Sequence, residues 1–255
     1  MKFIQSMQNP QVKHWKKLTA KKEREKTYTY LLEGFHLVEE ALKEKEGILE
    51  IIIEENVKIP ESWDLEGVPV TTVTQEISKA LADTETSQGI FAVCRMKKQP
   101  SKIIGKRYLL IDAVQDPGNI GTMIRTADAA GFDAVILGKG CADAYSPKVL
   151  RAAQGSHLHV GLLKGDLNMW IEKLKEAAVP VYGTALEGGV SYQQVTPGDS
   201  FAILVGNEGS GVNPDFLAQT EQNLYIPIFG KSESLNVAVA AGIIMYDFQM
   251  GTLKG

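Results

Sequence analysis

The chain has 255 residues, 44% of them hydrophobic, which is ample material for one large domain or two modest ones. Its net charge of −4 argues against a protein that coats nucleic acid everywhere, and its longest apolar run, Val237–Met245, is too short to cross a bilayer. Two cysteines and four histidines are too few for a disulfide framework or a zinc knuckle, so we expect no metal and no membrane segment, and, without a signal peptide, a cytoplasmic protein.

The first thirty residues form a basic segment in this otherwise acidic chain. The segment contains eight lysines and arginines but only two acidic residues, Glu23 and Glu25, and it also contains His14 and Trp15. This composition is typical of an arm that grips phosphate and stacks on bases. A solvated amphipathic helix, anchored by its one large aromatic residue, explains the same pattern, and the residues leave both interpretations open.

The first hundred residues predict a small α/β sandwich. The periodicity favours helices near 9–22, at 34–45 and at 75–81, and strands at 28–32, 49–54, 68–73 and 89–95. The polar segment 95–102, with Pro100, has the composition of an interdomain linker. We therefore expect one domain over residues 1–98 and a second over 103–255.

The second half alternates continuous apolar runs with helical segments. The runs are 108–114, 134–138, 157–163, 179–185, 201–206 and 223–228. Strands that are apolar on both faces are typical of a parallel sheet with helices on either side. Ligands of such sheets bind beyond the carboxyl ends of the strands, so the loops there should carry the site.

The first of these loops leads into a helix that ends at Gly131. Asn119 stands where a helix N-cap is expected, and Arg125 follows six residues later, within reach of a phosphate. Taken alone, a plain cap and a surface ion pair between Arg125 and Asp128 are the simpler interpretations.

The second loop follows the strand 201–205 and runs through three glycines, the first of them Gly206. They let the backbone approach a ligand closely, but their spacing is not that of a dinucleotide fingerprint. Glu208, between them, is either a turn carboxylate without a function or a group that positions a hydroxyl or a cationic ligand.

The third loop reads IFGKSESLNVAVAAG, from Ile228 to Gly242. Its letters GKS suggest a phosphate-binding loop, but Tyr225 stands where that motif requires glycine. Ser234 is the predicted N-cap of the last helix, 235–248. Asn236 then falls inside that helix, where a polar side chain among valines and alanines needs a partner.

Together the three loops resemble the signature of the SpoU (TrmH-like) branch of the SPOUT RNA methyltransferases. The matching residues are Asn119, Arg125, Thr126 and Ala127, then Gly206, Glu208 and Gly211, then Ser234, Leu235, Asn236 and Val237. The segment YLLEGFHLVEEAL, 30–42, is similar to the substrate-binding domain of that family's ribosomal-RNA enzymes. The resemblance implies methyl transfer from S-adenosylmethionine to a ribose 2′-hydroxyl of RNA, ribosomal rather than transfer RNA. It also implies a homodimer and a parallel-sheet catalytic domain with a trefoil knot.

The resemblance further implies roles for individual residues. The implied catalytic set is Asn119, Arg125, Glu208, Ser234 and Asn236. The implied donor pocket is Thr184, Ala185, Leu186, Gly206, Asn207, Ile226, Ile228 and Leu235. Arg125 is expected to hold a phosphate beside the target ribose, because a guanidinium hardly deprotonates and is a poor base. Arg151 and His159 are interpreted as mainly structural.

Two rival functions remain open. A protein with this fold could bind RNA without catalysis, as an assembly factor, although all five catalytic positions are filled. A nucleotide- or sugar-processing Rossmann enzyme is the second rival, and the failed fingerprints and the basic segment disfavour it.

Overall fold

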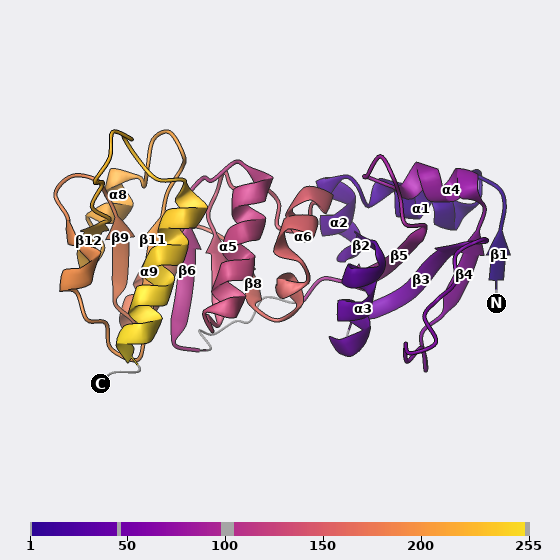
Figure 1. Cartoon of the computed structure of the whole chain (residues 1–255), viewed down its shortest axis with the longest axis horizontal. Coiled ribbons are helices and arrows are strands. Elements are labelled where there is room, and N and C mark those ends of the chain that lie inside the picture. Colours follow the sequence, from indigo (N-terminus) through magenta and orange to yellow (C-terminus); the bar gives the residue numbers. More distant parts are fainter. Residues whose placement is uncertain (1, 45–46, 98–104, 253–255) are drawn as a thin grey trace. The chain divides into compact units, whose positions relative to one another are not determined.

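The computed structural model describes residues 2–44, 47–97 and 105–252, which are drawn as ribbon in Figure 1. The chain divides into two compact units. Unit 1 consists of Met1–Lys98 with Tyr145–Leu158, and unit 2 of Gln99–Ala144 with His159–Gly255. Residues 145–158 therefore pack with the first unit, although they lie within the predicted second domain. Most of the predicted linker, 98–102, lies outside the described residues.

Unit 1 is a five-stranded sheet with helices on both faces; the sequence predicts the α/β sandwich but not its first strand, Lys2–Ile4. Its elements are β1 (Lys2–Ile4), α1 (Pro10–Lys17), α2 (Lys21–Thr27), β2 (Thr29–Glu33), α3 (Phe35–Glu44), β3 (Ile48–Glu54), β4 (Val70–Val73), α4 (Gln75–Leu81), β5 (Ile90–Arg95), α6 (Pro147–Ala153) and the 3₁₀ turn η1 (Ser156–Leu158). The strand order is β1-β4-β3-β5-β2. Side chains alternate across the sheet, so Ile51 and Ile53 of β3 enter the core under α3, while Ile52 enters the core under α1 and α4.

The predicted basic helix at 9–22 is wrong in its extent, because the chain breaks into α1 and α2. Arg24, only 2% exposed, donates to the carbonyl oxygens of Leu18 and Thr19 at 2.7 and 2.8 Å and so closes the end of α1. Trp15 is 1% exposed in the core, as the anchoring interpretation expected. Neither Arg24 nor Trp15 is therefore available to RNA.

Unit 2 is built on a seven-stranded sheet in which every pair is parallel. Its elements are β6 (Arg107–Ile111), α5 (Pro117–Ala129), β7 (Ala134–Leu137), β8 (Gly161–Lys164), α7 (Leu167–Glu176), β9 (Val181–Thr184), β10 (Val190–Ser191), η2 (Tyr192–Gln194), β11 (Phe201–Val205), α8 (Pro214–Leu217), β12 (Gln222–Tyr225) and α9 (Val237–Thr252). The order is β10-β12-β9-β11-β6-β7-β8. The strand predicted over 157–163 begins only at Gly161, because His157 is buried in unit 1 and packs edge-on against the Tyr30 ring.

Helices cover both faces of this sheet. Trp170, Ile171 and Leu174 of α7 pack on one face. On the other, α5 and α9 lie side by side, and Phe248 of α9 packs edge-on against Phe201 of β11 (Figure 1). Because all the strands are parallel, the loops that follow β6, β9, β11 and β12 share one edge of the sheet. Among the described residues, no helix is long and apolar enough to span a bilayer.

Candidate active site

The loop after β11 is a tight hairpin held by Asn207. Asn207 and Gly211 exchange two backbone hydrogen bonds of 2.9 Å, and Asn207 Oδ1 accepts from the amide of Gly209 at 2.9 Å. Its Nδ2 donates to the carbonyl of Ala113 at 2.8 Å. A Cβ on Gly206 would lie 2.2 Å from the backbone of Gly211, so only glycine fits there. The side chain and the backbone of Asn207 thus both hold the loop in shape.

Asn119 lies inside helix α5 and is not its N-cap, contrary to the sequence-based expectation. Pro117 occupies the first turn, and the side chain of Asp116 accepts from the amide of Asn119 at 2.7 Å as the cap. The side chain of Asn119 is therefore free for tertiary contacts. Its Nδ2 donates to Glu208 Oε1 at 3.0 Å, across 89 residues of sequence.

Asn236, rather than Ser234, caps the last helix, which begins at Val237. Asn236 Oδ1 accepts from the amides of Ala238 and Val239 at 2.9 and 3.3 Å. This corrects the predicted cap and explains why a poor helix former precedes the apolar helix. The hydroxyl of Ser234 is exposed and has no hydrogen-bond partner among the residues described.

Glu208, Asn119 and Asn236 form a hydrogen-bonded chain whose direction is set by the backbone. Because Asn236 Oδ1 faces two amides, its Nδ2 is the group that meets Asn119 Oδ1, at 2.9 Å. Asn119 must then present its own Nδ2 to Glu208, which can only accept when it is ionised. The three side chains come from the loop after β11, from α5 and from the start of α9.

The electrostatics of Glu208 agree with that direction. Partial burial alone would raise the pKa of its carboxyl. Hydrogen bonds from the Asn119 side chain and from the backbone amides of Glu208, Asp116 and Gln115 outweigh burial, so the pKa lies below its ordinary value of 4.5. Glu208 is therefore a carboxylate at neutral pH, and it holds Asn119 in place.

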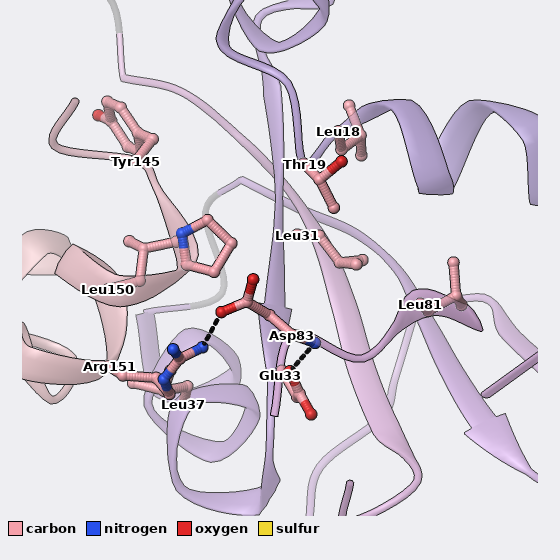
Figure 2. Close-up of a pocket in the computed structure, with 11 residues that line it drawn as sticks. Leu18, Thr19, Leu31, Glu33, Leu37, Leu81, Asp83, Tyr145, Leu150 and Arg151 are labelled. Carbon is pink, nitrogen blue, oxygen red and sulfur yellow. Dashed lines mark hydrogen bonds and ion pairs between the residues drawn. The ribbon is translucent and has the colours of Figure 1, made fainter. Parts of the chain in front are cut away.

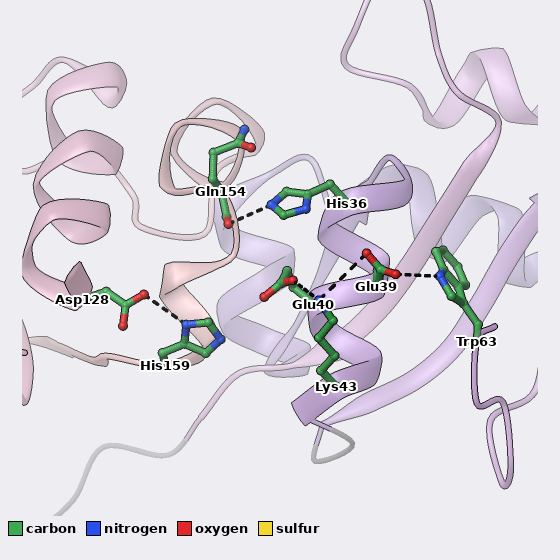
Figure 3. A network of polar contacts seen from close by, with 8 residues as sticks. All are labelled: His36, Glu39, Glu40, Lys43, Trp63, Asp128, Gln154 and His159. Carbon is green, nitrogen blue, oxygen red and sulfur yellow. Dashed lines mark hydrogen bonds and ion pairs between the residues drawn. The ribbon is translucent and has the colours of Figure 1, made fainter. Parts of the chain in front are cut away.

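The structure does not bring Arg125 into this chain. Arg125 is exposed on α5 and, at 100° per residue, points about 120° away from Asn119 around the helix axis. The expected ion pair with Asp128 is not formed, because Asp128 pairs with His159 Nδ1 at 3.0 Å (Figure 3). Within the described part of the chain, Arg125 has no hydrogen bond or ion pair.

Arg151 and His159, which the sequence analysis interprets as mainly structural, each contact a carboxylate. In unit 1, Arg151 Nη1 lies 2.7 Å from Asp83 Oδ2, at a cavity of about 20 Å³ (Figure 2). Such a cavity holds about one water molecule. His159 pairs with Asp128 within unit 2.

A cluster of three side chains in unit 1 has the geometry of a metal site, but its ligand atoms already contact other protein groups. His36, Glu39 and Glu40 could present three ligand atoms close together. Lys43 lies 2.7 Å from Glu40 and 4.0 Å from Glu39, while His36 Nε2 contacts the carbonyl of Gln154 (Figure 3). The cluster is thus a solvated polar network on α3.

A pocket of about 820 Å³ opens at the carboxyl ends of β9, β11 and β12, and we call it the strand-end pocket. All eight residues expected to bind the donor line it: Thr184, Ala185, Leu186, Gly206, Asn207, Ile226, Ile228 and Leu235. Of the expected catalytic set, Glu208, Ser234 and Asn236 line it too, and Asn119 is bonded to two of these. The volume suits a drug-sized ligand.

The charges of the strand-end pocket suit S-adenosylmethionine, whose sulfonium is cationic. Glu187, Glu208 and Glu233 line it, and its described lining contains no lysine or arginine. A dinucleotide or triphosphate would require the opposite charge. Sequence reasoning missed Glu187, Tyr225 and Glu233 as lining residues, although each lies within two residues of one that it named.

Comparison with known proteins bears on this site. Residues 106–246 match the SpoU rRNA Methylase family, and residues 9–92 match the MRM3-like substrate binding domain. The 23S rRNA (guanosine(2553)-2′-O)-methyltransferase RlmP of Bacillus subtilis is 52% identical over 247 residues, which cover 96% of this chain and 98% of that enzyme.

Solved structures agree over nearly the whole chain. The AdoMet-bound rRNA methyltransferase of Sinorhizobium meliloti superposes with a TM-score of 0.86 at 29% identity, covering 98% of this chain and 97% of that one. The SpoU methyltransferase AviRb of Streptomyces viridochromogenes shares the fold, with a TM-score of 0.85 at 23% identity over 97% of this chain and 100% of that one. The chain belongs to the SpoU rRNA methylase family, whose S-adenosylmethionine-dependent chemistry methylates a ribose 2′-hydroxyl of RNA.

Proposed function

We propose that this protein methylates the 2′-hydroxyl of a guanosine in 23S ribosomal RNA, at the position that corresponds to guanosine 2553. The similarity to the Bacillus subtilis enzyme along almost the entire chain supports this substrate. The main structural support for methyl transfer is the hydrogen-bonded chain Glu208–Asn119–Asn236. This chain lies at the strand-end pocket, whose acidic lining suits a cationic donor.

The strand-end pocket holds the methyl donor in this proposal. S-adenosylmethionine supplies an electrophilic methyl group on a positively charged sulfur. Backbone groups near Gly206 and Ile226 would bind the edge of its adenine, and Leu186 and Leu235 would provide apolar walls for the ring. The pocket's three carboxylates favour the sulfonium electrostatically.

The target ribose is held by side chains at the rim of the pocket. Asn236 Nδ2 carries two hydrogens, of which one goes to Asn119, so the second remains for a ribose or phosphate oxygen. The hydroxyl of Ser234 offers another contact. The oxygens of Glu208 are engaged by Asn119 and by backbone amides, so Glu208 positions Asn119 rather than taking the ribose proton. Catalysis then depends mainly on aligning the 2′-oxygen with the methyl group. The carbon–oxygen bond would form as the carbon–sulfur bond of the donor breaks, and the ribose proton would pass to solvent water.

Arg125 binds a phosphate of the substrate, and the protein acts as a homodimer. The outer face of α9 supports the dimer: Val239, Tyr246 and Met250 are 53%, 47% and 51% exposed and, at spacings of seven and four residues, form one apolar stripe. Since Arg125 points away from Asn119 in its own chain, we propose that it acts at the strand-end pocket of the second subunit. Sedimentation should give twice the 27.9 kDa of one chain.

The two domains have separate functions in this proposal. Residues 1–98 bind the RNA substrate and residues 103–255, knotted as in related SPOUT enzymes, carry out the transfer in the cytoplasm. Exposed lysines on α1 and α2 support the first role: Lys13, Lys16, Lys17, Lys21, Lys22 and Lys26. Phosphate contacts by lysine supply sequence-independent affinity.

The test is transfer of labelled methyl groups to ribosomal RNA. Purified protein, labelled S-adenosylmethionine and 23S rRNA that lacks the modification should give one 2′-O-methylguanosine, which reverse transcription at low nucleotide concentration locates. Label on transfer RNA alone would refute the substrate. Intact RNA binding with no transfer to any RNA would favour the non-catalytic assembly factor.

A further inference from the structure

Phe229 is the most exposed large hydrophobic side chain of the described residues, at 97%. It lies in the segment 226–236 between β12 and α9, which we call the β12–α9 loop (upper end of α9 in Figure 1). Isolated exposed apolar residues are common, but a phenylalanine ring left almost entirely in water gains from any ligand that covers it. The position of the ring within unit 2 indicates which ligand that is.

The ends of the β12–α9 loop are fixed and its middle faces outward. β12 pairs with β9 and β10 on one side, and the cap formed by Asn236 holds the other. Ile226, Ile228 and Ser234 line the strand-end pocket, whereas Phe229 does not. A donor bound in that pocket can cover Leu186 and Leu235, the other exposed apolar residues there, but it leaves Phe229 bare.

The neighbours of Phe229 favour RNA. Lys231, two residues on, is exposed and lacks any ion pair within the described chain. An aromatic ring beside a free cation is the combination that binds a base and its phosphate together. Ser234 and Asn236, the proposed ribose contacts, belong to the same loop as Phe229, so a nucleotide held by them would place a base near this loop.

We propose that Phe229 stacks on a base of the substrate RNA at or next to the methylated nucleotide, and that Lys231 contacts the adjoining phosphate. The inference rests on the proposed methylation of RNA at the strand-end pocket. It adds a base-binding surface, outside the donor pocket and the polar chain, that positions the target nucleotide. Because every base has a stacking face, the contact contributes affinity and alignment rather than sequence selection.

The experiment compares Phe229→Ala, Phe229→Trp and wild type on a hairpin around guanosine 2553 of 23S rRNA. Phe229→Ala should weaken RNA affinity by about 5- to 150-fold, the range that base–aromatic stacking spans, and raise KM for RNA. Phe229→Trp should restore both. Met169→Ala, an exposed apolar residue on α7, is the matched control and should leave both unchanged.

An abasic hairpin identifies the contact. Removing the base at the target or at its neighbour should weaken wild-type binding and have little further effect on Phe229→Ala, because the two changes remove the same stacking interaction. Donor affinity, measured by calorimetry, should be the same in all variants.

Three results would overturn the inference: unchanged RNA affinity in Phe229→Ala, lost donor affinity, or a shift from dimer to monomer in sedimentation, which would assign the ring to a subunit interface. Failure of the wild-type protein to methylate any RNA would instead overturn the proposed function. The two failures are therefore distinguishable.

Discussion

Asn236 Nδ2 donates to Asn119 Oδ1 at 2.9 Å, joining the starts of two helices that lie 117 residues apart in sequence. The same Asn236 caps α9 through its other side-chain atom. One residue thus links helix stability to the geometry of the site, and the two contributions can be separated by substitution.

Asn236→Asp should separate capping from positioning. A carboxylate still accepts from the amides of Ala238 and Val239, but it cannot donate to Asn119. We expect near wild-type stability in urea unfolding and a large loss of methyl transfer. Asn236→Ala should lose the activity and, in addition, about 1 kcal/mol of stability from the missing cap. Equal activity of wild type and Asn236→Asp would contradict the positioning role.

Gly206→Ala and Gly209→Ala are a matched pair in one loop. A Cβ on Gly206 meets the backbone of Gly211 at 2.2 Å, whereas on Gly209 its nearest neighbour is Asn207 Oδ1 at 3.6 Å. Gly206→Ala should therefore disrupt the hairpin and abolish donor binding, while Gly209→Ala should keep it. Calorimetric titration with S-adenosylmethionine measures the difference, and similar affinities for both variants would show that the hairpin does not shape the donor site.

Arg125→Ala should lower the rate of methyl transfer by on the order of 10²-fold or more. Without Arg125 to hold the phosphate, the target ribose is misaligned. Donor affinity should stay the same, since Arg125 does not line the strand-end pocket. Arg125→Lys keeps the charge but loses the two-pronged phosphate contact, so it should recover only part of the rate. Selective loss of donor affinity would refute the phosphate role.

Glu208 should make stability depend on pH in the acid range. Because its folded-state pKa lies below the ordinary 4.5, its contribution is complete above that value and is lost as the pH falls through the lowered pKa. Wild type should therefore exceed Glu208→Gln in unfolding free energy at about pH 7, and the difference should shrink below about pH 4.5.

The Asn119→Ala background tests the cause of that shift. Asn119 supplies the largest of the hydrogen bonds that lower the pKa of Glu208. In this background, Glu208→Gln should lower the unfolding free energy by less than it does in the wild type, and this difference should depend less on pH. An unchanged effect would show that the backbone amides alone set the pKa.

The exposed lysines of α1 and α2 should account for part of the RNA affinity. Replacing Lys16, Lys17, Lys21 and Lys22 by glutamine should weaken binding uniformly. The slope of log affinity against log salt should fall by about 0.7 to 0.9 for each phosphate that a lysine no longer neutralises. Substitution is a sharper test than deletion of residues 1–26, which would also remove Trp15 from the core. An unaltered slope would assign these lysines a purely solvating role.

Local signals in the sequence locate most of the longer elements but miss β1, α6, β10 and α8 and misplace two helix caps. Asp116 followed by Pro117 is a recognisable helix start, although Asn119 is an equally good capping residue three positions later. At α9 both Ser234 and Asn236 are good caps, and nothing in a short window distinguishes them. Because Asn236 caps α9, the hydroxyl of Ser234 is not used for capping. Because Asp116 caps α5, the side chain of Asn119 can make tertiary hydrogen bonds.

By itself the sequence determined the parallel sheet, the loops that line the strand-end pocket and, through the spacing of three motifs, the family. Apolar periodicity and motif intervals are properties of the chain order. Only the tertiary structure decided that Glu208, Asn119 and Asn236 bond in one direction, that Arg125 points elsewhere, and that residues 145–158 pack with unit 1. These outcomes depend on which surfaces meet in space, and hydrogen bonds across 89 and 117 residues leave no trace in local patterning.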